Sequence, residues 1–172
     1  MSSLAQLVDQ ATDEYLVAPD WEKNVMICSL IDSPQAGVEF GYALRRRLNL
    51  SEPRIIGRSL DLLQMAMQDS YWVVIAVHHP EFQKFLVDKA RASRWPYEEQ
   101  NKLLNLVRSW GETYFPGHQN PGGAFPNYFK TYQYLVNLSC RFPGKSDDSN
   151  FHPPIPPQNR QVGALRYPQE GE

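Results

Sequence analysis

The side chains that could bind a metal ion or perform catalysis are few, and their spacing matches no common site. His78 and His79 are adjacent and therefore point in different directions. His118 and His152 belong to a predicted loop and a predicted tail. Two cysteines are too few for a disulfide framework or a metal cluster, and the chain has no glycine-rich phosphate loop or nucleophile elbow. We therefore expect a binding protein that has no enzymatic activity and needs no metal ion or cofactor.

A tryptophan at the start of a predicted helix is the strongest candidate for a contact residue. Asp20 is a good N-cap for this helix, because its carboxylate can accept hydrogen bonds from the N–H groups of the first turn. The apolar stripe of the helix consists of Asn24, Ile27, Cys28 and Ile31. Trp21 lies off this stripe. It either packs as a staple against Tyr15 or Leu16 or contacts a partner, and both interpretations remain open here.

Three consecutive arginines, Arg45, Arg46 and Arg47, stand near the end of another predicted helix. Basic side chains at a helix C-terminus complement the helix dipole, which is the interpretation that we favour. The alternative is contact with anionic lipid such as a phosphoinositide, where each basic residue adds about 1 kcal/mol. Three residues would give only marginal attachment to a membrane.

A proline-containing segment follows the last predicted helix. Its prolines have the spacing of ligands for SH3 or WW domains: Pro153, Pro154, Pro156 and Pro157. Short runs of this kind are also common in plain linkers, and we favour that interpretation. Residues 141–172 are therefore predicted to be a disordered tail, and residues 1–140 to be the folded domain.

Apolar residues at helical spacing predict a succession of helices. The first ends before Pro19, and the others cover about 20–31, 35–48, 53–67, 71–77, 80–90, 96–110 and 128–138. The apolar band of 53–67 is wide, which is typical of a central helix that is buried on more than one side. The side chains that we expect to face the core include Tyr15, Val38, Leu48 and either Tyr42 or Ala43.

The segment 71–77 is ambiguous, because seven apolar residues rich in valine could form a buried strand or a short buried helix. No second strand candidate is present to pair with it. A lone strand would leave backbone N–H and C=O groups unpaired in the core, so we predict a helix. The predicted fold class is therefore all-α.

Composition bounds the possible partners and the compartment. The 172 residues suffice for one domain, and a hydrophobic content of 42% supports a core without a metal or a disulfide. A net charge of -2 gives no general attraction to nucleic acid or to anionic lipid. The N-terminus lacks the pattern of a secretion signal, and no apolar run reaches the roughly 18 residues of a membrane span. We expect a cytoplasmic protein that does not bind nucleic acid.

Several short sequences follow one another in a characteristic order: Ala11-Thr12-Asp13, Pro19-Asp20-Trp21, Ala43-Leu44-Arg45, Leu60-Asp61-Leu62-Leu63, Glu81-Phe82 and Leu106-Val107. In this order and spacing the chain resembles a VHS domain over about residues 4–140. The resemblance implies a right-handed superhelix of about eight helices, of the ENTH/VHS type. It also implies an adaptor for endosomal protein traffic that is peripheral on endosomal or Golgi membranes.

The resemblance implies ubiquitin, or ubiquitinated cargo, as the partner. In the ubiquitin-binding members of the Hrs and STAM type, a tryptophan at the start of the second helix and an apolar residue one turn later contact ubiquitin. Trp21 and Val25 occupy these two positions. The exposed side of the fourth helix helps in that contact, and by face it corresponds here to Arg58, Asp61, Gln64, Met65 and Gln68.

Two other recognition modes are alternatives. In VHS domains of the GGA type, the sixth and eighth helices bind an acidic-dileucine signal through basic residues. This chain has Glu81 and the pair Val136-Asn137 at the corresponding positions, which Lys84 and Lys130 offset only in part. A related superhelix binds the phosphorylated tail of RNA polymerase II, and in this chain Arg58 and Arg108 are the candidates for contact with such a phosphopeptide.

Overall fold

The regular elements are all α-helices in the part of the chain that the computed structural model describes, which is residues 2–91, 94–115, 124–145 and 151–157. Eight helices occur there: α1 (Ser3–Ala11), α2 (Trp21–Leu30), α3 (Pro34–Leu48), α4 (Pro53–Asp69), α5 (Tyr71–His78), α6 (Pro80–Arg91), α7 (Tyr97–Thr113) and α8 (Pro126–Asn137). The prediction of an all-α fold is confirmed.

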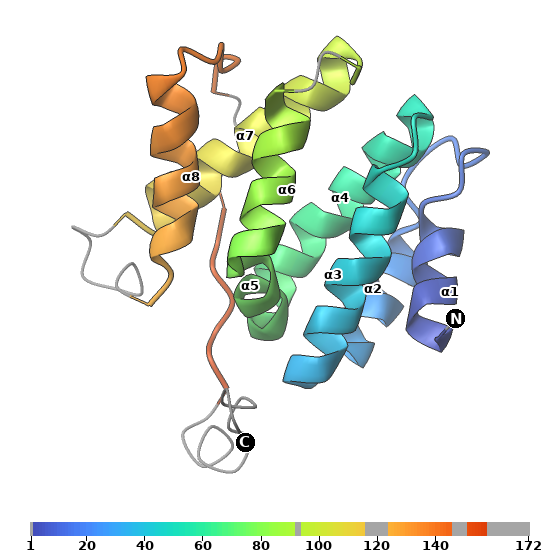
Figure 1. Ribbon diagram of the computed structural model, residues 1–172. Helices are drawn as coiled ribbons and strands as arrows, with labels where there is room; N and C mark the ends of the chain where they lie inside the picture. Colours follow the sequence, from blue (N-terminus) through green and yellow to red (C-terminus); the bar gives the residue numbers. More distant parts are fainter. Residues whose placement is uncertain (1, 92–93, 116–123, 146–150, 158–172) are drawn as a thin grey trace.

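The helices form two interlocking rows (Figure 1). In one row α1 packs on α3, α3 on α5, α5 on α6 and α6 on α8. In the row behind it, α2 packs on α4 and α4 on α7. The prediction that α4 is central is confirmed, because this helix contacts both rows and its buried residues cover more than one side.

Short polar side chains start several helices by accepting hydrogen bonds from first-turn N–H groups. Asp20 accepts from the Lys23 N–H at 3.1 Å, which confirms the predicted N-cap of α2. Ser33 accepts from Ala36 at the start of α3 in the same way. The buried stripe of α2 is also as predicted, since Asn24 and Ile27 are buried completely or nearly so.

The valine-rich segment is helix α5, as predicted. Ser70 caps its start by accepting a hydrogen bond from the N–H of Val73. The residues Trp72, Val73, Val74 and Val77 are buried. Because α3, α4 and α6 pack around this short helix, burial on several sides outweighs the preference of valine for strands.

The buried side of α3 differs from the prediction at one position. Val38 was expected in the core but is 49% exposed, whereas Leu48 is buried as predicted. Of the two alternatives Tyr42 and Ala43, Ala43 is the buried one and Tyr42 is 59% exposed. The cause is Gly37, where a Cβ atom would lie only 2.6 Å from the backbone oxygen of Trp72. This glycine lets α3 approach the backbone of α5, and Val38 is therefore turned outward.

The first helix is shorter than its apolar pattern suggests. It ends at Ala11, and Tyr15 is 80% exposed, so the prediction that Tyr15 faces the core is wrong. The hydroxyl of Thr12 donates to the carbonyl oxygen of Val8 at 2.8 Å, and the carboxylate of Asp13 accepts from the N–H of Tyr15. These local bonds replace the next helical turn.

Part of the predicted tail packs against the domain instead of leaving it. The ring of Phe142 lies edge-on to Tyr132, with centroids 5.4 Å apart, and Arg108 donates to the carbonyl oxygen of Pro143 at 2.7 Å. Farther along, Phe151 contacts the ring of Tyr114. The expectation of a tail without core contacts is wrong for these residues, while 146–150 and 158–172 lie outside the described residues.

Candidate functional site

Four large hydrophobic side chains are exposed on one face of α2, and we call this surface the α2 apolar face. Trp21, Val25, Met26 and Leu30 are 55%, 54%, 50% and 45% exposed. Trp21 and Val25 are one helical turn apart and form one row, and Met26 and Leu30 form a second row on the other side of Glu22 and Ser29. Large apolar side chains that are exposed together on one helix indicate a contact site.

Met26 and Leu30 are not among the contact residues that the sequence predicts. The signal was present, because apolar residues occur all round this helix while Ile27 and Cys28 already account for its buried face. A helix that is apolar all round is either buried on several sides, as α5 is, or exposes part of its apolar surface, as α2 does.

Trp21 has most of its side chain available to a partner. The interpretation of Trp21 as a staple required packing against Tyr15 or Leu16. Tyr15 is itself 80% exposed, so it covers little of the indole, whereas Leu16 is half-buried and packing of Trp21 against it stays a prediction. The backbone under Trp21 is nevertheless fixed, because the helix begins at this residue and Asp20 caps it.

The α4 residues of the predicted site do not form an open surface. Asp61 is buried to 9% exposure, and its carboxylate accepts from Arg58 at 2.9 Å and from Lys102 of α7. The expectation that Asp61 faces outward is therefore wrong. The physical reason is that α7 packs on α4 and supplies a second cation that compensates the buried carboxylate.

The remaining members of the α4 set are partly covered. Met65 packs against the hydrophobic core, and Gln64 is half-buried. The side-chain oxygen of Gln68 accepts a hydrogen bond from the N–H of His152 at 3.3 Å. Of the predicted contact residues, only Trp21 and Val25 are thus widely exposed.

The three arginines at the end of α3 contact other parts of the domain. Arg46 pairs with Asp9 of α1 at 2.6 Å, and Arg47 donates to the hydroxyl of Thr12 at 2.8 Å. The guanidinium of Arg45 lies over the rings of Tyr42 and Phe82. These contacts join α3 to α1 and to α6, and they favour the structural role of the arginines over contact with lipid, which stays a prediction.

The residues of the other predicted contacts are largely at the surface. Glu81, Lys84 and Lys130 are exposed, and the binding of an acidic-dileucine signal near them stays a prediction. In the proline segment, Pro153 and Pro156 are exposed and the other two prolines are half-buried. Their contact with an SH3 or WW domain stays a prediction.

His78 connects the end of α5 to the start of α8. Its Nε2 accepts a hydrogen bond from the N–H of Asn127 at 3.0 Å, and its carbonyl oxygen accepts from the Asn127 side chain. Burial, followed by the charges of Lys130 and His79, lowers the pKa of His78 from 6.5 to about 4. Protonation would remove the acceptor that holds the start of α8.

The lowered pKa predicts that the domain loses stability in mild acid. Between pH 6.5 and 4 the unfolded chain binds more protons at this residue, so the free energy of unfolding falls as the pH falls. Allowing for the partial exposure of the ring, we expect His78 to account for a loss of about 1 kcal/mol in the free energy of unfolding between pH 7.5 and pH 5. Urea unfolding of the wild-type chain and of His78→Gln at both pH values measures this loss. Equal pH dependence in the two chains would contradict the prediction.

Neither cysteine of the chain is a strong candidate for chemistry. Burial, and then the charge of Asp69, raises the pKa of the Cys28 thiol to about 12, which makes it unreactive near neutral pH. Cys140 is half-buried. Among the described residues, no three potential metal ligands lie together, and no helix combines the length and the apolar character needed to cross a bilayer.

Comparisons with known proteins agree with this architecture. The family model described as VHS domain matches residues 1–125. TOM1-like protein 8 of Arabidopsis thaliana is 29% identical over 168 residues, which is 95% of this chain and 25% of that protein. TOM1-like protein 1 of the same organism is 27% identical over 145 residues, covering 84% of this chain and 34% of that protein. The chain thus spans between a quarter and a third of the length of these relatives.

A solved structure has the same fold. It contains the VHS and FYVE tandem domains of Hrs, a protein involved in membrane trafficking and signal transduction. The TM-score is 0.71 at 20% sequence identity, and the match covers 88% of this chain and 68% of the other. The expected superhelix is thereby confirmed.

Proposed function

This chain belongs to the VHS domain family, and we propose that it is a non-enzymatic adaptor in membrane traffic that binds ubiquitin on cargo through the α2 apolar face. The observation that carries the proposal is the exposure of Trp21, Val25, Met26 and Leu30 on one helix whose opposite side is anchored in the core. Trp21 and Val25 are also the residues at the positions that contact ubiquitin in the Hrs and STAM type.

The proposed contact differs from the sequence-based hypothesis in its extent. It runs along α2 to Leu30, and it relies less on α4, because Asp61 is engaged by Arg58 and Lys102. Gln64 and Met65 of α4 are half-buried, so part of each side chain remains available. A thioether can adapt its shape to a partner, which suits Met26 and Met65 to such a contact.

Binding through this surface alone should be weak. One face of a helix of 10 residues is small compared with the roughly 1,200 Å² that stable complexes bury, so the contact belongs with transient ones. Weak contacts become effective when several domains meet several ubiquitin molecules on one membrane. We therefore place the protein at endosomal or Golgi membranes, as the trafficking role of Hrs also suggests.

An NMR titration of the labelled chain with ubiquitin tests the proposal. We expect the largest shifts at the amides of Val25 and Met26 and at the indole of Trp21, with saturation only at high micromolar to millimolar ubiquitin. A peptide with the sequence Asp-x-x-Leu-Leu is the matched probe for the alternative mode. Shifts on α6 and α8 with this peptide, and none on α2 with ubiquitin, would contradict the proposal.

A further inference from the structure

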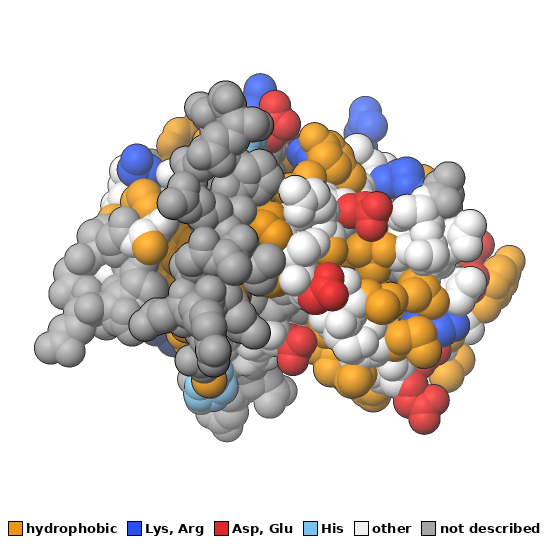
Figure 2. All heavy atoms as spheres, turned by 90° about the horizontal axis from the view of Figure 1, so that it is seen from below, with side chains coloured by type: hydrophobic (Ala, Val, Ile, Leu, Met, Phe, Trp, Pro, Cys, Tyr) orange, Lys and Arg blue, Asp and Glu red, His pale blue; other side chains and the backbone are white. Residues whose placement is uncertain are grey.

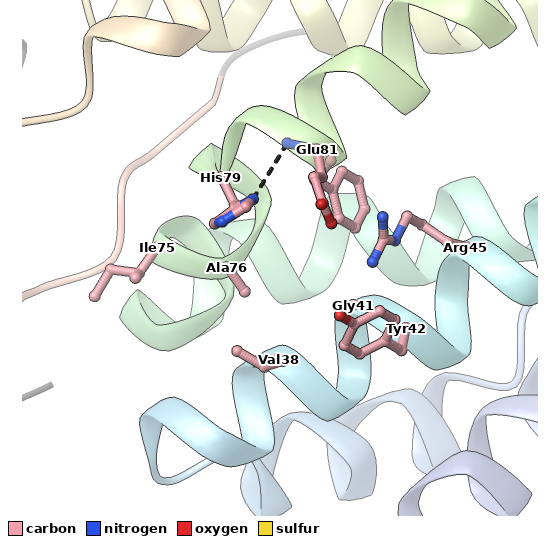
Figure 3. A pocket seen from close by; sticks show the side chains of 9 residues that line it. Val38, Gly41, Tyr42, Arg45, Ile75, Ala76, His79 and Glu81 are labelled. Atoms are coloured by element: carbon pink, nitrogen blue, oxygen red, sulfur yellow. Dashed lines mark hydrogen bonds between the residues drawn. The ribbon is translucent and has the colours of Figure 1, made fainter. Parts of the chain in front are cut away.

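Two adjoining cavities between α3, α5 and the start of α6 form one surface groove, which we call the α3–α5 groove (Figure 3). Their volumes are about 360 and 570 Å³, and they share Val38, Tyr42, Ile75 and Ala76. Its described lining comes from α3, α5 and α6, so it is separate from the α2 apolar face. Nothing in the proposed binding of ubiquitin uses it.

The groove is a consequence of the close approach of α3 to α5. At Gly37 the two helices touch through the backbone of Trp72, which leaves no room for a side chain between them. The next residues of α3, Val38 and Tyr42, are therefore displaced to the outside and form one wall. Ile75 and Ala76 of α5 form the opposite wall (Figure 3).

The charged groups of the groove have an acidic excess. Its titratable residues are Glu39, Arg45, His79 and Glu81. The guanidinium of Arg45 is held 4.7 Å from the centroid of Tyr42 and 5.5 Å from that of Phe82. His79 accepts a hydrogen bond from the N–H of Glu81 through Nδ1 (Figure 3).

The two carboxylates of the groove are available to a partner. In the described part of the chain, neither Glu39 nor Glu81 has an ion-pair partner. α3 begins at the lower end of the helical part in Figure 1, and the view from below in Figure 2 shows acidic side chains among hydrophobic ones on this side of the molecule. A partner with apolar side chains and cationic flanks is complementary to this surface.

The backbone of the groove selects a helical partner over an extended one. The walls are helices, whose N–H and C=O groups beyond the terminal turns are paired within each helix, so an extended peptide would find few backbone partners there. An amphipathic helix brings its own backbone hydrogen bonds and needs only side-chain contacts. From Pro34 to Arg45 the wall of α3 is about 16 Å long at a rise of about 1.5 Å per residue, which matches three helical turns.

We propose that the α3–α5 groove binds an amphipathic helix of a partner protein. Its apolar side chains lie against Val38 and Ile75, and lysine or arginine side chains on its flanks approach Glu39 and Glu81. Bound partners would thus occupy a surface different from that of ubiquitin, and one domain could hold both at once.

The test uses two synthetic helices of about 12 residues that carry leucines at i, i+4 and i+7 and either lysines or glutamates on both flanks. We expect the lysine peptide to shift the amide signals of Val38 and Ile75 and to bind at least about fivefold more tightly than the glutamate peptide. In the double variant Glu39→Lys, Glu81→Lys, the glutamate peptide should bind more tightly than the lysine peptide. Both carboxylates are exposed, so the variant should fold.

Two single variants complete the experiment. Val38→Asp should abolish binding of the lysine peptide, whereas Val25→Asp on α2 should abolish binding of ubiquitin and leave the peptide affinity unchanged. The two proposals can therefore fail separately. Equal affinity of both peptides, or shifts on α2, would overturn the groove proposal. Self-association of the chain that Val38→Asp prevents would also overturn the groove proposal, because a second copy of the chain would then occupy the groove. A gain in peptide affinity on removal of residues 158–172 would overturn it as well, because these residues would then be the occupant.

Discussion

Replacing Trp21 by alanine is expected to weaken ubiquitin binding by a factor of about 10 or more while leaving the fold intact. A tryptophan at the centre of a small interface commonly contributes 2 kcal/mol or more on truncation. The side chain is 55% exposed, and alanine is well accepted in the first turn of a helix, so the free energy of unfolding should change by less than about 0.5 kcal/mol. NMR titration and urea unfolding of the same variant measure both quantities.

The control for this prediction is Tyr97→Ala. Tyr97 is another widely exposed aromatic residue, but it opens α7 and has no place in the α2 apolar face. Its replacement should leave ubiquitin binding unchanged. If Trp21→Ala binds ubiquitin as well as the wild-type chain does, or if it unfolds much more easily, the indole is a packing residue and the α2 mechanism is wrong.

Replacing Gly37 by alanine is expected to destabilise the domain by about 1–3 kcal/mol, although alanine is the better helix former. The new Cβ would lie 2.6 Å from the oxygen and 3.0 Å from the carbonyl carbon of Trp72, and both are backbone atoms. Relief of this clash requires α5 to move, and the buried Val73 and Val74 hold that helix in the core. In thermal unfolding, the midpoint temperature Tm should decrease by several degrees.

Gly57→Ala is the matched control, since this glycine is also within a helix. A Cβ at Gly57 would meet only a side-chain oxygen of Glu99, at 3.8 Å. The substitution should therefore stabilise the domain by about 0.5–1 kcal/mol through helix propensity. Opposite signs at the two glycines are the expected result, and a gain of stability for Gly37→Ala would contradict the close approach of α3 to α5.

The patterns that the sequence alone revealed are local ones. Asp20 followed by a helical stripe predicted the start and the buried face of α2, and both are confirmed. The valine-rich segment was assigned to a helix by the absence of a strand partner, and α5 is that helix. The family resemblance rested on the order of such local patterns, and the family match confirms it. Local patterns suffice here because caps and periodicity involve residues within one or two turns.

What covers each helix was decided only by the tertiary structure. Lys102, which compensates the carboxylate of Asp61, is 41 residues away from it in the chain. Asp9, which pairs with Arg46, is separated from it by 37 residues. Periodicity shows that a helix has an apolar side, but the neighbour that packs there depends on contacts between distant segments.

The two proposed contact surfaces illustrate this division. Trp21 could be singled out from the sequence because it lies off the buried stripe of its own helix, and Val25 could be singled out through the family resemblance. The α3–α5 groove could not, because its walls exist only where Gly37 brings α3 against Trp72 and turns Val38 and Tyr42 to the outside. The sequence by itself determined the helices and the family. The tertiary contact of Gly37 in α3 with the backbone of Trp72 in α5 determined which side chains of α3 are exposed.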